Sequence, residues 1–174
     1  MEYWYFEVFK TLATNNVKYV VVGGIAINLL GIPRFTADLD IVVALDKKNV
    51  INFIKCMSLL GYRPKAPVNP KDFADLKIRQ EWIKTKNITV FSFWRPDKPY
   101  QIVDVFIKEP IPFEKMWGKR EKIKLQNLTV PVISIKDLKK LKKTANRAQD
   151  ISDLKALDEL NKELHHEQKT HKRG

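Results

Sequence analysis

The hydrophobic pattern of residues 1–44 predicts an alternation of helices and strands. Large apolar side chains recur at helical spacing over residues 2–14, which predicts an amphipathic helix. Residues 17–22 form a short β-branched run that ends at two glycines, as expected of a buried strand. The apolar residues 25–30 then predict a tight turn into a helix, and a second apolar strand is expected over 38–44.

Two longer helices are expected in the middle of the chain. Asp46 is suited to cap a helix over residues 47–60, and Gly61 is placed to end it. The prolines of residues 64–70 indicate a surface loop. A second helix is expected to follow over about residues 71–84.

Strand candidates return after this second helix. Residues 88–94 and 101–107 are separated by a turn-rich segment and alternate between two faces. A weaker candidate covers residues 123–133, where Pro131 should restrict the strand to a sheet edge or a strand end. In the second candidate, Asp104 is a lone charge in an apolar strand.

The C-terminal third is predicted to be helical. Ser134 opens a capping-box-like sequence, and two leucine stripes follow that are broken near residues 145–149. The tail, residues 165–174, is polar and expected to fray. We therefore predict an α/β fold, in which residues 1–133 form a core with a small mixed sheet and flanking helices, and residues 134–174 form a C-terminal helical segment with a basic tail.

Composition narrows the protein class. The chain has 174 residues, 44% of them hydrophobic, which suffices for one globular domain with a real core. No apolar run approaches the roughly 20 residues of a membrane span, and the N-terminus lacks the features of a secretory signal, so we expect a cytoplasmic protein without a membrane partner. A single cysteine excludes an internal disulfide framework and a Cys-rich zinc site.

The net charge of +12 favours an anionic partner such as RNA, DNA or a nucleotide. A lysine-rich surface also serves solubility, so charge alone leaves this open. The densest cationic run lies between Lys136 and Arg147.

Three aspartates form the candidate chemical centre. Side chains two apart in a strand point to the same face, so the carboxylates of Asp38 and Asp40 should project together and repel each other unless a cation or a proton intervenes. Asp104 on a neighbouring strand would complete a cluster able to hold one or two Mg²⁺ ions. Such a cluster suits in-line phosphoryl displacement, with the third carboxylate as a base toward the attacking hydroxyl.

The dipeptide Gly23-Gly24 fits the same chemistry. Glycines allow the backbone to approach a ligand closely, and a helix beginning there would aim N–H groups at phosphate. Alone, two glycines more often mark only a turn. Their combination with the aspartate pair downstream makes a phosphate site the stronger interpretation.

These segments resemble the signature of the nucleotidyltransferase superfamily, whose fold is shared with DNA polymerase β. The resemblance rests on Gly23-Gly24, Arg34-Phe-Thr-Ala-Asp38-Leu-Asp40-Ile-Val-Val and Ile102-Val-Asp104-Val-Phe. The Arg-x-Thr-x-Asp-Leu-Asp form is similar to the small branch that contains AbiEii-type toxins and minimal nucleotidyltransferases. Weaker support comes from Lys143-Thr-Ala-Asn-Arg147-Ala-Gln-Asp150-Ile-Ser-Asp153-Leu, which resembles the helical element after the catalytic sheet.

The resemblance implies a role for each matching residue. Gly23 and Gly24 would hold the nucleotide triphosphate, although many superfamily members have serine at the second position. Asp38 and Asp40 would ligate Mg²⁺, and Asp104 would complete the ligand set and act as base.

It also implies nucleotide contacts outside the carboxylates. Arg34 and Thr36 would orient the site or contact phosphate, and Lys143, in preference to Lys142 or Lys140, would reach the triphosphate. Two structural alternatives stay open. Arg34 could instead balance the charge of Asp38 or Asp40, and the lysine run could simply be a solvent-exposed helix face.

The function implied is Mg²⁺-dependent transfer of a nucleoside monophosphate from an NTP to a hydroxyl acceptor. The basic surface favours RNA, such as a tRNA end, as that acceptor. The alternatives are a protein hydroxyl in a toxin–antitoxin partner (AMPylation), a small molecule such as an aminoglycoside, and a non-catalytic nucleotide or RNA binder.

Overall fold

The computed structural model describes residues 3–171, except for the side chains of residue 165 and residues 167–171. Within these residues a seven-stranded sheet has the order β3-β4-β5-β2-β1-β7-β6. Its strands are β1 (Tyr19–Val22), β2 (Leu39–Val43), β3 (Arg63–Pro64), β4 (Val90–Arg95), β5 (Lys98–Phe106), β6 (Glu121–Leu125) and β7 (Leu128–Val132). Strand β2 runs antiparallel to β1 and parallel to β5, so the sheet is mixed, as predicted.

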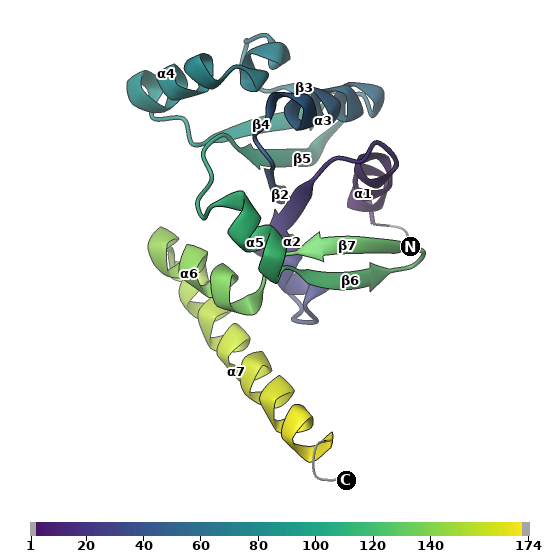
Figure 1. Cartoon of the computed structure of the whole chain (residues 1–174), viewed down its shortest axis with the longest axis vertical. Coiled ribbons are helices and arrows are strands. Elements are labelled where there is room, and N and C mark those ends of the chain that lie inside the picture. Colours follow the sequence, from purple (N-terminus) through teal and green to yellow (C-terminus); the bar gives the residue numbers. More distant parts are fainter. Residues whose placement is uncertain (1–2, 172–174) are drawn as a thin grey trace.

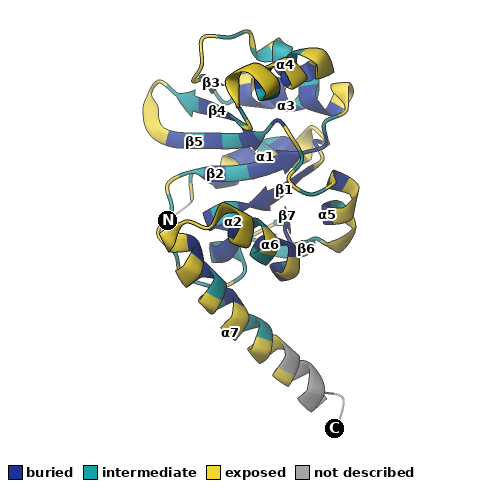
Figure 2. Ribbon diagram, turned by 90° about the vertical axis from the view of Figure 1, so that its left-hand side faces the viewer, coloured by how far each residue is buried: buried dark blue, intermediate teal, exposed yellow. Residues whose placement is uncertain are grey.

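Helices cover this sheet. They are α1 (Tyr5–Thr14), α2 (Gly23–Leu29), α3 (Lys47–Leu59), α4 (Leu76–Lys86), α5 (Phe113–Lys119), α6 (Ile135–Ala145) and α7 (Ala148–His171), with a short 3-10 helix η1 (Pro70–Ala74). Figures 1 and 2 show α3 and α4 together beside strands β3 to β5, while α7 extends away from the sheet. The predicted α/β class, with a helical C-terminal segment, is confirmed.

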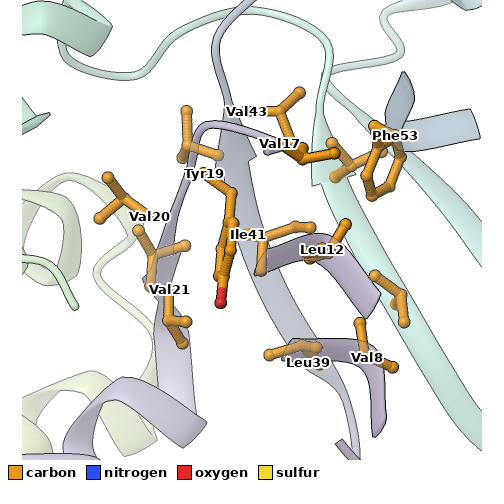
Figure 3. Close-up of a cluster of buried hydrophobic side chains, with 14 of the residues drawn as sticks. Val8, Leu12, Val17, Tyr19, Val20, Val21, Leu39, Ile41, Val43 and Phe53 are labelled. Carbon is orange, nitrogen blue, oxygen red and sulfur yellow. The ribbon is translucent and has the colours of Figure 1, made fainter. Parts of the chain in front are cut away.

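Ring contacts identify which helices pack on one face of the sheet. The pairs are Phe9 of α1 with Tyr19, Phe53 of α3 with Phe93, and Trp82 of α4 with Phe91. Figure 3 shows Val8 and Leu12 of α1 reaching Tyr19, Leu39 and Ile41 of the central strands. All these side chains are buried, so the main core lies between this face and α1, α3 and α4.

The opposite face of the central strands receives α6. Leu138 and Leu141 of α6 line a cavity together with Val22 of β1 and Phe106 of β5. Asp40 of β2 lines the same cavity, so the face that meets α6 also carries the start of β2.

Most predicted capping residues act as expected. The Asp46 side chain accepts from the backbone N–H of Asn49, and Ser134 accepts from that of Asp137. Gly61 follows α3 with a positive φ of 79°. The predicted break in the C-terminal helices is confirmed between α6 and α7, where Asn146 adopts a left-handed conformation.

Three predictions in the middle of the chain need correction. The helix expected over 71–84 is divided at Asp75, whose carboxylate caps α4 after the 3-10 turn η1. The single strand expected over 123–133 is wrong, because a turn at Gln126, with a φ of 55°, folds this segment into the β6–β7 hairpin. Helix α5 and the two-residue strand β3 were not predicted.

The C-terminal tail was expected to fray from residue 165. The structure instead continues α7 to His171, and residues 172–174 lie outside the described residues. Across the described part of the chain, no helix is both long and apolar enough to cross a membrane.

Candidate active site

The turn from β1 into α2 is built around Gly23. Its φ is 67°, a conformation that side-chain-bearing residues rarely adopt. A Cβ on Gly23 would lie 2.0 Å from Oδ2 of Asp40, because Val22 pairs with Asp40 across β1 and β2. Glycine is thus required both by the backbone and by the carboxylate beside it.

Gly24 is enclosed by the segment that leads into β2. A Cβ on Gly24 would lie 2.2 Å from Nη1 of Arg34 and 2.6 Å from Oγ1 of Thr36. The guanidinium and the hydroxyl therefore occupy the space that a serine side chain would need. This explains in physical terms why the chain has glycine here.

The parallel pairing of β2 and β5 sets Asp40 directly beside Asp104. Burial and the charges of Asp104 and Asp38 raise the pKa of Asp40 from 3.8 to about 6, although Lys142 and Arg147 lower it. Burial also raises the pKa of Asp104, while a hydrogen bond from Ser92 lowers it. Two members of the predicted carboxylate cluster, Asp40 and Asp104, are therefore neighbours near the start of β2, and Asp38 directly precedes this strand.

The carboxylates are incompletely satisfied by protein groups. The Oδ1 atom of Asp104 is buried and has no hydrogen-bond partner. Among the described residues, no three His, Cys, Asp or Glu side chains are grouped closely enough to hold a metal ion alone. Mg²⁺, however, commonly binds one or two carboxylates and takes its other ligands from phosphates and water. Asp40 and Asp104 fit an ion that arrives with a nucleotide.

A buried ion network joins the C-terminal helices to the site. Nζ of Lys142 donates to Oδ1 of Asp150 at 2.9 Å and to Oδ2 of Asp153 at 2.7 Å. Nε of Arg34 donates to both carboxylate oxygens of Asp153, at 3.0 and 3.1 Å. Nε and the backbone N–H of Arg147 donate to Oδ2 of Asp150.

The network fixes cations beside the acidic cluster. Burial raises the pKa of Asp150, but hydrogen bonds from Arg147 and Lys142 bring it down to about 2. The carboxylate partner of Arg34 is Asp153 of α7, not Asp38 or Asp40 as the sequence had left open. Lys142 and Arg147 line the same cavity as Asp40, and their charges lower the pKa of its carboxyl.

A polar cavity of about 330 Å³ brings most of the predicted residues together. Those lining it are Gly23, Gly24, Arg34, Thr36, Asp38, Asp40 and Asp104, joined by Lys142, Arg147 and Gln149. Lys143 does not line it; it is exposed and borders a hollow on the outer side of α6. The lysine at the site is Lys142, which is 3% exposed.

A second cavity, of about 430 Å³, adjoins the first. The two share Gly23, Asp40, Lys142 and Arg147. Leu138, Leu141 and Phe106 give the second cavity a largely apolar wall. The site thus combines a polar chamber at the carboxylates with an apolar chamber between the sheet and α6.

No protein-family model and no curated protein sequence matches the chain, but solved structures resemble it. The lincosamide antibiotic adenylyltransferase LnuA, with lincomycin bound, superimposes with a TM-score of 0.59 and 16% identity, over 89% of this chain and 94% of that one.

Two further structures give similar values. ANT(2″)-Ia in complex with adenylyl-2″-tobramycin has a TM-score of 0.57 and 13% identity, over 87% of this chain and 84% of that one. An antigenic nucleotidyltransferase-like protein from Paracoccidioides brasiliensis has a TM-score of 0.54 and 18% identity, over 86% and 71%. The chain therefore has the nucleotidyltransferase fold, and Asp38, Asp40 and Asp104 line one cavity with the glycine turn.

Proposed function

We propose that the protein is a Mg²⁺-dependent nucleotidyltransferase, which moves a nucleoside monophosphate from an NTP to a hydroxyl acceptor and releases pyrophosphate. The observation that carries this proposal is the pairing of Asp40 with Asp104 beside the turn at Gly23. Carboxylates in a half-buried cluster, next to a backbone that can approach phosphate, are the arrangement that metal-assisted phosphoryl transfer requires.

The reaction consists of one displacement at the α-phosphorus. The acceptor oxygen forms a bond to this phosphorus, and the bond from the α-phosphorus to the oxygen bridging it to the β-phosphate breaks, so that pyrophosphate leaves. Asp104 takes the proton of the acceptor hydroxyl, directly or through water. Mg²⁺ held by Asp40 and Asp104, with phosphate oxygens of the nucleotide among its other ligands, would supply charge stabilisation to the phosphoryl oxygens.

The triphosphate is assigned to the side of the cluster formed by α2 and α6. Gly23 and Gly24 offer backbone N–H groups at the start of α2, a position that favours phosphate. Arg34, Lys142 and Arg147 supply positive charge around the same cavity. The apolar second cavity is suited to the nucleoside, which it would receive between α6 and the sheet.

Two classes of molecule are candidates for the acceptor. The net charge of +12 favours RNA, because phosphate contacts dominate such binding. A small-molecule acceptor is the second candidate, since LnuA and ANT(2″)-Ia were solved with an antibiotic and with an adenylylated antibiotic.

Incubation with each α-labelled NTP and Mg²⁺ tests the proposal. Total RNA, cell lysate, or an antibiotic panel serves as acceptor, and the Asp38→Asn, Asp40→Asn double variant is the control. Label on RNA supports the first candidate, label on an antibiotic the second, and label on protein an AMPylating enzyme of a toxin–antitoxin pair. Absence of any label that depends on the two aspartates would leave only a non-catalytic nucleotide binder.

A further inference from the structure

One face of strands β4 and β5 is only partly covered. Burial alternates along both strands: Phe91, Phe93, Val103 and Val105 are buried, whereas Ser92, Trp94, Ile102 and Asp104 are partly exposed. The antiparallel register pairs Ser92 with Asp104 and Trp94 with Ile102. These four side chains therefore share one face, and the candidate base Asp104 lies among them.

The next strand adds positive charge to this face. Arg63 of β3 pairs with Trp94, so the two side chains lie on the same side of the sheet. The N–H of Lys65 donates to the carbonyl of Ser92, and the charge of Lys65 lowers the pKa of Asp104. Arg63 and Lys65 are both exposed. We call the surface of Arg63, Lys65, Ser92, Trp94 and Ile102 the open face.

The position of the open face relative to the phosphate side decides its role. In the sheet order, β1 with its glycine turn lies on one side of β2, and β5, β4 and β3 follow on the other. An in-line displacement needs the attacking oxygen opposite the leaving pyrophosphate. If the triphosphate occupies the glycine side, the acceptor must approach Asp104 over the open face.

The charge of the open face discriminates between acceptors. Amino-sugar antibiotics are polycations. The carboxylate of Asp104 would attract them, but Arg63 of β3 and the adjacent Lys65, at the far side of this face, would repel them. The nearby acid Asp97 is already paired with Arg95 at the end of β4, so the carboxylate of Asp97 is not free to attract a cation. A polyanion with flat aromatic groups matches the surface, because its phosphates can meet the cations while a base stacks on Trp94.

We propose that the open face binds the 3′-terminal nucleotides of a single-stranded polynucleotide and presents their terminal hydroxyl to Asp104. Trp94 stacks a base, while Arg63 and Lys65 contact phosphates. Trp94 and Asp104 are diagonal neighbours on adjacent strands, about 7–8 Å apart, which is the scale of one nucleoside. The inference rests on the proposed function, whose acceptor class it names.

Binding of a fluorescein-labelled ten-nucleotide RNA, followed by anisotropy across a salt series, tests the surface. Trp94→Ala should weaken binding by about 5- to 150-fold, the range for one base–aromatic stack. Arg63→Gln with Lys65→Gln should make the slope of log K against log salt shallower by about 1.4, since each single-strand phosphate contact contributes about 0.7. The matched control is Lys122→Gln with Lys124→Gln, which removes two exposed charges from β6 at the opposite edge of the sheet.

Transfer assays identify the end that reacts and the kind of polynucleotide. An RNA with a free 3′-hydroxyl should be extended by labelled NTP, and the same RNA ending in a 3′-phosphate should not. A DNA strand of the same sequence shows whether the ribose 2′-hydroxyl is required. Stabilisation by Mg²⁺ and ATP in a thermal shift assay should be equal in all variants, which shows that they fold and bind nucleotide.

Two results would overturn the open-face proposal. One is unchanged RNA binding in Trp94→Ala; the other is an equal loss in the β6 control, which would mean diffuse charge attraction. If RNA is still labelled in either case, the proposed transfer stands without this surface. If the open-face variants lose RNA binding but the wild type labels no acceptor, the surface stands and the proposed function fails.

Discussion

Replacing Asp40 by asparagine should stabilise the protein in the absence of metal and nucleotide. Burial and two neighbouring carboxylates raise the pKa of this side chain from 3.8 to about 6. The folded state therefore holds the proton more tightly than the unfolded state, and stability falls as the pH rises from 3.8 through about 6.

The size of the effect follows from the pKa difference. The pKa of Asp40 differs by about two units between the unfolded and folded states, and each unit corresponds to about 1.36 kcal/mol. Above pH 7 the wild type is therefore less stable toward unfolding, by about 3 kcal/mol, than it would be with a neutral side chain at position 40. Asn at position 40 removes the charge and keeps the shape. For a domain of this size, about 3 kcal/mol corresponds to a rise in Tm of about 6–12 °C.

Thermal unfolding of the wild type and Asp40→Asn between pH 4 and pH 8 measures this difference. The gap in Tm should be small at pH 4, where the wild-type carboxyl is largely protonated in the folded state, and largest above pH 7. Glu121→Gln, which removes an exposed acid on β6, controls for net charge. A gap that is independent of pH, or a less stable Asp40→Asn protein at pH 7.5, would refute the reasoning.

Three other substitutions test the packing and the chemistry of the site. Lys142→Met leaves two buried carboxylates without their shared cation and should destabilise the protein by about 3–5 kcal/mol in urea unfolding, whereas the exposed Lys143→Met should change stability by less than about 0.5 kcal/mol. Gly23→Ala should lower the free energy of unfolding by about 1–3 kcal/mol, because Gly23 has a positive φ and an added Cβ would clash with Asp40. The control Gly118→Ala, in an open position of α5, should be neutral or stabilising. Equal effects of the two substitutions would contradict the assigned turn. Asp104→Asn should lose at least about 100-fold in transfer rate, and undiminished transfer would exclude Asp104 as the base.

The sequence could predict the core of the site because its determinants are local. The alternating pattern puts Asp40 of β2 and Asp104 of β5 each among apolar neighbours on its own strand, and Asp38 lies just before β2 instead of inside the strand as predicted. The structure brings Asp38, Asp40 and Asp104 into one cavity with Gly23 and Gly24.

The lysine was harder to predict because α6 contains several candidates in succession. Only helical phase separates them: Lys142 lies four residues after the buried Leu138 and shares its face, while Lys143 is turned outward. A phase argument from the apolar stripe would have favoured Lys142. The link from Arg34 to Asp153 spans the chain and depends on how α7 packs, which no local pattern encodes.

The β6–β7 hairpin was missed for a different reason. Its turn uses Gln126 in a left-handed conformation, without the glycine that usually marks such turns. Pro131 was predicted to lie at a sheet edge or at a strand end. Strand β7 lies between β1 and β6 and is not at an edge, but Pro131 is the second-last residue of β7, so the strand-end prediction is confirmed.

The central claim is that the α-phosphate of an NTP is transferred to a hydroxyl. It is tested most directly by counting labelled nucleotide joined to an acceptor against pyrophosphate released, with Mg²⁺ and with EDTA. We expect one pyrophosphate for each nucleotide transferred, with both products lost in EDTA and in the Asp38→Asn, Asp40→Asn variant. Equal product from this variant, or label recovered only as free nucleoside monophosphate, would contradict the account.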